Sequence, residues 1–81
     1  GECMRVFAAR LKNIREKKHL KRYVLSERCG LNPDAIRRYE QEKALPTLDA
    51  LESIADELEV SIDYLVGRTD YPRVVSIKKF F

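Results

Sequence analysis

The 81-residue sequence is poor in the residue types that build metal centres and disulfide frameworks. It contains one histidine, His19, and two cysteines, Cys3 and Cys29, which stand far apart and form no CxxC pair. A structural zinc site takes about four such ligands, so we expect no metal and no cofactor. No histidine-containing catalytic set is visible either, which argues against a hydrolase. We therefore predict that the protein is not an enzyme.

Long hydrophobic runs are also missing. No apolar stretch approaches the roughly 18 residues of a membrane-spanning helix, and the N-terminal residues lack the apolar core of a signal peptide. A chain of this length makes one domain at most, with a modest core and little room for a catalytic cleft. We expect a cytoplasmic protein with no membrane partner and no evident small-molecule ligand.

Charge is present in both signs but is unevenly distributed. Residues 1–45 hold twelve Lys and Arg against six Asp and Glu, a net charge of +6. Residues 46–66 hold six acidic and no basic residues (−6), and residues 67–81 hold four basic residues and one acidic (+3), which gives the total of +3. A basic surface attracts phosphate backbones, although a solvated face of mixed charge could have the same composition.

Apolar residues recur at helical spacing along most of the chain, which predicts an all-α fold. The expected helices span about residues 5–18, 23–29 and 33–41, then Thr47 to Leu58 and Ser61 to Gly67. We expect Asn32 to cap the third helix and Pro33 to occupy its first turn. Residues 1–67 would then form the folded domain, and residues 68–81, which are apolar and basic, would form a C-terminal arm that is either a strand or an extended segment.

The second and third helices are short, and only Gly30-Leu31-Asn32 separates them, which predicts a helix-turn-helix. Ser26 would be the small residue at the helix crossing. If Ile36 and Tyr39 are buried, Arg37 and Arg38 face outward, where arginine can bind guanine O6 and N7. A compact helical hairpin without a role in DNA binding could need the same residues.

Three consecutive motifs carry a family resemblance: LKNIREKKHLKR, LSERCGLNPDAIRRYEQEKALP and TLDALESIADELEVSIDYLVGR. From about Phe7 to Gly67, their order and spacing resemble the Cro/repressor-type (XRE-like) helix-turn-helix regulators of phages and bacteria. The resemblance implies a five-helix, lambda-repressor-like bundle that binds double-stranded DNA sequence-specifically, usually as a homodimer. We expect a transcriptional regulator of the repressor type that places helix 33–41 in the major groove.

Residue roles follow from matching positions in that family and from exposure on the expected helices. The residues expected to contact bases are Asn32, Pro33, Asp34, Arg37 and Arg38. The residues expected to contact phosphates are Lys21, Arg22, Gln41 and Lys43. Arg15 and Glu40 match an ion pair between the first and third helices. The sequence departs from the family where Lys21 replaces a Ser or Thr cap and where Glu42 replaces a common glycine.

The C-terminal segment leaves two further interpretations open. The residues expected to support a homodimer are Ile62, Leu65, Val75, Ile77 and Phe80, although the arm could instead fold back on its own subunit. The alternative function is an antitoxin-type interaction protein, which would bind a toxin through its C-terminal segment and regulate its own gene through the helix-turn-helix.

Overall fold

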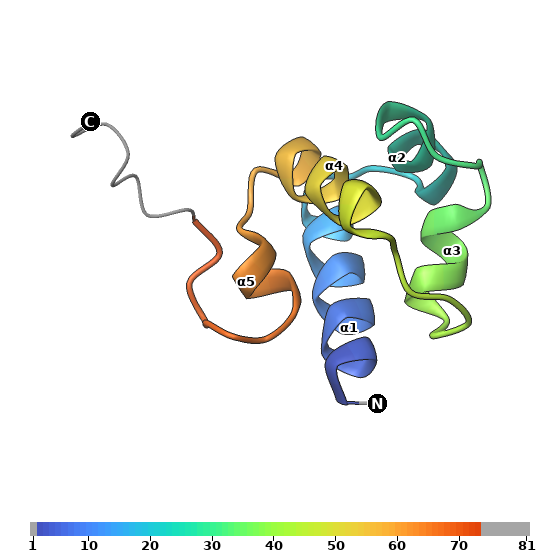
Figure 1. Ribbon diagram of the computed structural model, residues 1–81. Helices are drawn as coiled ribbons and strands as arrows, with labels where there is room; N and C mark the ends of the chain where they lie inside the picture. Colours follow the sequence, from blue (N-terminus) through green and yellow to red (C-terminus); the bar gives the residue numbers. More distant parts are fainter. Residues whose placement is uncertain (1, 74–81) are drawn as a thin grey trace.

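The computed structural model describes residues 2–73, in which the chain forms five α-helices and no strand. The helices are α1 (Glu2–Lys17), α2 (Arg22–Arg28), α3 (Ala35–Glu40), α4 (Leu48–Leu58) and α5 (Ile62–Leu65). Helices α2 and α3 lie on one side of α1, and α5 lies on the other (Figure 1). The expected all-helical fold is confirmed. The expectations for Val75, Ile77 and Phe80 lie outside the described residues.

The core forms where the apolar faces of the five helices meet. From α1, Phe7, Leu11 and Ile14 recur at the three- and four-residue spacing that puts side chains on one face of a helix. They pack with fully buried side chains of the other helices: Leu25, Ile36, Ile54, Leu58 and Leu65. Burying each such side chain stabilises the fold by about 1.5–3 kcal/mol. This core is what holds the short helices α2 and α3, since helices of this length are unstable alone.

Two predicted helix starts are confirmed by side-chain caps. Thr47 Oγ1 accepts a hydrogen bond from the N–H of Ala50 at 3.1 Å, and Ser61 Oγ accepts one from the N–H of Tyr64 at 3.0 Å. Each satisfies an N–H group that the first turn of a helix leaves without a partner. Local sequence therefore determines where α4 and α5 begin.

The third helix begins at Ala35, two residues later than the sequence predicted. Asn32 caps no helix. Its side-chain Oδ1 accepts from the N–H of Asp34 at 3.0 Å, and its carbonyl accepts from the N–H of Ala35 at 2.9 Å. These bonds close a tight turn, in which Pro33 occupies a position that its fixed φ suits. The side chain of Asp34, the residue before the helix, makes no capping bond.

Two leucines are placed differently from the sequence expectation. Leu48 shares the helical spacing of Leu51, Ile54 and Leu58, which predicts a place on the buried stripe of the fourth helix. It is instead 72% exposed, because it lies in the first turn, ahead of the buried face that starts at Ala50. Leu65, expected in a dimer interface, is 0% exposed and belongs to the core of its own domain. Leu65 therefore has no surface to offer a partner. Ile62, which was also expected in the dimer interface, is half-buried against the same core.

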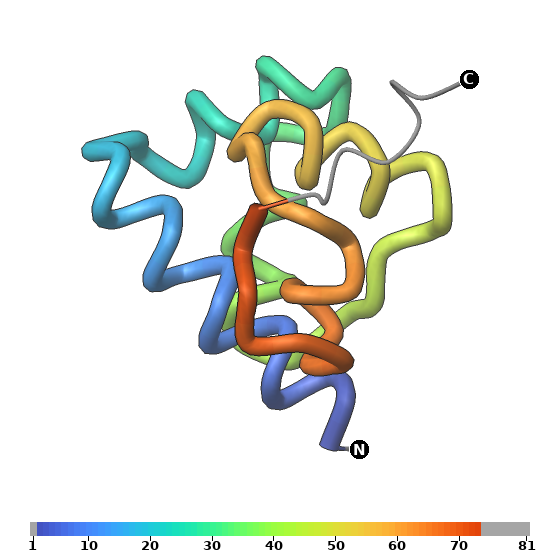
Figure 2. Tube along the Cα trace, turned by 90° about the vertical axis from the view of Figure 1, so that its left-hand side faces the viewer, coloured from blue at the N-terminus to red at the C-terminus, as the bar shows by residue number. Residues whose placement is uncertain are grey.

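The segment that follows Gly67 contacts α1 and the start of α5. Arg10 on α1 donates to the carbonyl oxygens of Tyr64 (2.7 Å) and Thr69 (2.6 Å) and pairs with Asp70 at 2.9 Å. Its guanidinium also lies 4.3 Å from the centre of the Tyr64 ring. The segment after α5 consequently curls back beside α1 (Figure 2). The N–H of Ser61 donates to the carbonyl of Pro72 at 2.7 Å, so the same segment also contacts the residue before α5.

We expect Gly67→Ala to destabilise the domain by about 2 kcal/mol, because a left-handed backbone costs an L-residue roughly 1–2 kcal/mol and crowding adds to it. Gly67 has a φ of +87°, and a Cβ there would lie 2.9 Å from Val6 Cγ1. Gly30→Ala is the matched control, since Gly30 has a φ of +71° and open space around it. Thermal unfolding should show the larger loss for Gly67→Ala. Equal losses would contradict the close contact with Val6.

Cys29, the residue directly after α2, packs against the core and is a free thiol. Burial, and secondarily the negative charge of Glu57, raises the pKa of Cys29 to about 11. The thiol is therefore protonated at neutral pH and acts as a small apolar side chain.

Two kinds of feature are absent from the part of the chain that the structure describes. No helix within residues 2–73 is both long and apolar enough to cross a membrane. In the same range, no three His, Cys, Asp or Glu side chains come close enough together to hold a metal ion.

Candidate nucleic-acid interface

Helices α2 and α3 are locked together through Ser26, which is fully buried. Its hydroxyl donates to the carbonyl of Arg22 at 3.0 Å and accepts from the N–H of Ile36 at 3.2 Å. That N–H is one of those that the first turn of α3 cannot satisfy itself. A larger side chain would separate the helices, so a small hydroxyl residue suits the crossing. Gly30, with a φ of +71°, ends α2 in the left-handed conformation that glycine adopts at low cost.

Arg15 and Glu40 form the ion pair that the family resemblance implied, and it fixes α3 against α1. Arg15 Nε donates to Glu40 Oε2 at 2.6 Å, and Nη2 donates to Oε1 at 3.1 Å. The Arg15 side chain is 11% exposed and that of Glu40 is 4% exposed. Arg15 also donates through Nη1 to the carbonyl of Leu20 at 2.8 Å, which ties in the segment between α1 and α2.

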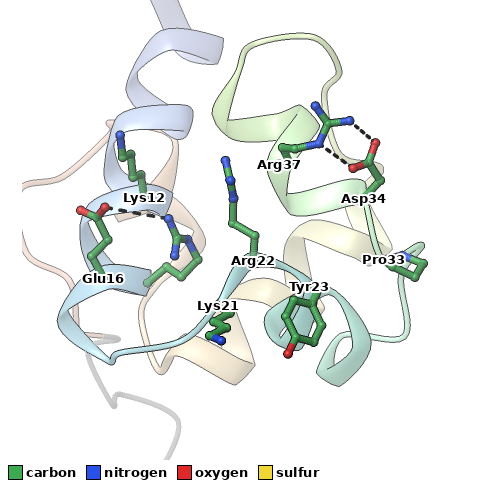
Figure 3. A pocket seen from close by; sticks show the side chains of 9 residues that line it. Lys12, Glu16, Lys21, Arg22, Tyr23, Pro33, Asp34 and Arg37 are labelled. Carbon is green, nitrogen blue, oxygen red and sulfur yellow. Dashed lines mark hydrogen bonds and ion pairs between the residues drawn. The ribbon is translucent and has the colours of Figure 1, made fainter.

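A basic groove runs between α1, the start of α2 and the start of α3 (Figure 3). Its lining residues are Lys12, Arg15, Glu16, Lys21, Arg22, Tyr23, Pro33, Asp34 and Arg37. The side chain of Arg22 extends between α1 and α3, and Lys12 lies beside it on α1. Lys12, Lys21 and Arg22 are all exposed. The groove thus presents three exposed cationic side chains, from α1 and from the start of α2. Such a surface suits binding of the anionic phosphate backbone of a nucleic acid.

The exposed face of α3 carries a chain of polar contacts. Arg37 donates through Nε to Asp34 Oδ1 at 2.6 Å and through Nη2 to the other carboxylate oxygen. Through Nη1 it donates to Gln41 Oε1 at 3.2 Å. The hydrogen bond from Arg37 lowers the pKa of Asp34 below its usual value, and the same bond raises the pKa of Arg37. The two side chains therefore form a pair without net charge at neutral pH.

Arg38 differs from its neighbour. Its side chain is exposed, and among residues 2–73 no ion pair involves it. Its carbonyl accepts from the N–H of Lys43 at 2.9 Å, which closes the turn after α3. Glu42 in that turn has a φ of +60°, the conformation that the glycine common in the family would adopt more easily. Arg38 is thus the cation on α3 with the greatest freedom to contact a ligand.

The residues expected to contact phosphates are all exposed, but they lie in two places, at the start of α2 and after the end of α3. Lys21 and Arg22 are exposed at the start of α2, where Lys21 makes no side-chain cap. Lys43 is exposed in the turn after α3. Gln41, directly after α3, accepts from Arg37 through Oε1, and this contact uses none of the N–H donors of its amide group.

The sequence analysis did not identify Lys12 as a residue of this groove, the pairing of Asp34 with Arg37, or the contacts of Arg10. Lys12 stands one helical turn before Arg15, so the helical period could have placed both on the side of α1 that meets α3. The pairing of Asp34 with Arg37 also had a signal, because residues three apart on one helix face are neighbours. No signal in the sequence indicated the contacts of Arg10, because its partners lie 54 to 60 residues away along the chain.

A short helix, a glycine turn and a second short helix with an exposed polar face, flanked by basic side chains, define a helix-turn-helix domain. The helix-turn-helix family model matches residues 11–65. The chain belongs to this family, and the resemblance to Cro/repressor-type (XRE-like) regulators is confirmed.

Two curated relatives share this region. A Bacillus subtilis protein named as an uncharacterized HTH-type transcriptional regulator, YobD, is 34% identical over 67 residues, or 83% of this chain and 60% of the relative. The transcriptional repressor RstR of the cryptic phage CTXphi in Vibrio cholerae is 37% identical over 59 residues, or 73% of this chain and 53% of the relative. The chain therefore spans little more than half the length of these proteins.

A solved structure shows the same fold. The crystal structure of the hypothetical transcription factor NHTF from Neisseria matches with a TM-score of 0.75 over 82% of this chain and 78% of the other. The sequence identity is 24%, so this likeness bears on the fold alone.

Proposed function

We propose that this domain binds double-stranded DNA sequence-specifically and acts in the cytoplasm as a transcriptional regulator of the repressor type, without catalysis. The observation that carries the proposal is the position of the exposed face of α3 beside the basic groove. None of the acidic residues of α4 or α5 lines that groove. Support for repression comes from the Vibrio cholerae relative, which is named a transcriptional repressor.

In this proposal α3 enters the major groove, whose width admits an α-helix and whose base edges distinguish all four base pairs. Arg38 contacts a base, and Lys21, Arg22 and Lys43 contact phosphates on either side. We add Lys12 to the phosphate set, because it shares the basic groove with Arg22. Phosphate contacts position the domain, and base contacts supply the specificity.

We further propose that two copies bind together. A homodimer would place two copies of α3 about 34–36 Å apart, one turn of B-DNA, on a two-fold symmetric site. The fully buried Leu65 is excluded from such an interface.

The test is selection of bound sites from random duplexes, followed by titration of the selected duplex and a random one at several salt concentrations. Arg22→Ala should weaken both duplexes alike and reduce the slope of log K against log salt by about 1, since one phosphate contact is lost. The number of copies bound at saturation distinguishes a dimer from a monomer. Absence of any enriched sequence would contradict the proposal.

A further inference from the structure

We infer that Asp34 and Arg37 act on DNA as one unit, in which Asp34 accepts a hydrogen bond from the amino group of a cytosine and Arg37 positions it. The inference rests on the proposed function and assigns two different roles to residues that the family resemblance treats alike. Asp34 becomes a determinant of specificity, and Arg37 is a positioning residue rather than a second base reader.

The contacts of Arg37 use three of its five N–H groups, which leaves it less capacity to bind a base than an unpaired arginine has. Its Nε and Nη2 both donate to the Asp34 carboxylate, so the side edge of the guanidinium is occupied. Its third nitrogen, Nη1, donates to Gln41. A bidentate contact with guanine needs two N–H groups on one free edge. Using the side edge would require Arg37 to release Asp34, which would leave a bare carboxylate beside the DNA.

Asp34, in contrast, keeps accepting capacity. A carboxylate has about four lone-pair sites, and the contacts with Arg37 use two of them. Its side chain is 48% exposed, and it lines the basic groove together with Arg22. Asp34 can therefore accept a further hydrogen bond while Arg37 continues to hold it.

The major-groove edges select the base that such an acceptor fits. Cytosine presents the N4 amino donor there, whereas guanine presents only the acceptors N7 and O6, and thymine presents the acceptor O4 and a methyl group. Adenine offers one donor beside one acceptor, so it fits a carboxylate less well than cytosine does. Asp34 thus favours cytosine and opposes guanine and thymine, where two acceptors would face each other.

Charge explains why the pair is needed. An isolated carboxylate in the basic groove would repel the phosphates that Lys12, Lys21 and Arg22 attract. Arg37 cancels that charge through two hydrogen bonds from a rigid fork, which also fixes the direction of the carboxylate. The arrangement keeps the acceptor and removes most of the repulsion.

The experiment uses the full chain and the duplex selected above, with each base pair of the site replaced in turn. Asp34→Ala should reduce the preference for cytosine at one base pair by about tenfold, within the range for a base contact. Arg37→Ala should reduce the preference at the same base pair, and the double variant should lose no more than Asp34→Ala alone. Asp34→Asn should shift that position towards adenine, because an amide matches adenine N6 and N7.

Arg38→Ala serves as the control, since it should relax a different base pair and leave the cytosine preference unchanged. The inference is overturned if Arg37→Ala relaxes a guanine preference at another position while the cytosine preference persists. It is also overturned if Asp34→Ala and Asp34→Asn leave every base preference intact. Failure of the unaltered chain to select any duplex would instead overturn the proposed function, and this inference with it.

Discussion

Arg38→Ala is expected to weaken binding to the selected duplex by about 1–3 kcal/mol, or roughly 5- to 150-fold, and to relax the preference at one base pair. Arg38 is exposed on α3, and no ion pair among the described residues restrains it. Its guanidinium can therefore turn both N–H groups of one edge towards guanine. Random DNA should lose much less affinity, because it offers the residue only phosphates.

The measurement is a pair of titrations, one with the selected duplex and one with a random duplex, at the same salt concentration. Arg22→Ala is the matched control, since it removes an arginine of the same surface that faces the basic groove. The control should lower both affinities in equal proportion. Equal losses for Arg38→Ala on the two duplexes would reduce Arg38 to a phosphate contact.

Glu40→Ala is expected to destabilise the domain by about 3–5 kcal/mol, because it leaves the charge of Arg15 buried without its partner. The Arg15 side chain is 11% exposed, and two of its three hydrogen bonds go to Glu40, whereas Glu16 lies 4.0 Å from Nη2 and is itself exposed. For a chain of this size such a loss lowers the Tm by roughly 12–40 °C. Thermal or urea unfolding of the purified variant measures it.

Two variants separate charge from packing in this prediction. Glu40→Gln retains a hydrogen-bond acceptor for Arg15 without the charge, and we expect an intermediate loss. Arg15→Met combined with Glu40→Leu removes both charges, and should be less harmful than Glu40→Ala because no unpaired charge remains. An unchanged Tm for Glu40→Ala would show that water screens the pair and that α3 is held by the core alone.

Much of the fold could be predicted because its signals are local. The spacing of Phe7, Leu11 and Ile14 gives α1 its buried face, and Thr47 and Ser61 cap the helices that follow them. These effects act over one or two helical turns, so neighbouring residues suffice to specify them. The start of α3 was less predictable, because Asn32 can serve either a helix cap or a tight turn, and here it serves the turn.

The sequence was enough to predict which residues lie on the exposed face of α3, but not which side chains they contact there. Exposure on a helix follows from the helical period, which is why Arg37 and Arg38 were both expected at the surface. Their different roles depend on which neighbouring side chain each one contacts, and exposure on a helix does not specify that. The Arg15–Glu40 pair came from the family resemblance, since 25 residues separate the partners and periodicity cannot connect them.

The sequence by itself determined that this protein is an all-helical domain of the helix-turn-helix family, because helical periodicity, caps and the order of the motifs are written along the chain. Only the tertiary structure decided which side chains from distant parts of the chain meet. Arg10 holds Thr69 across 59 residues, and Leu65 turns into the core instead of towards a partner. Such contacts depend on how whole helices pack in three dimensions, and no pattern within a few turns of sequence specifies them.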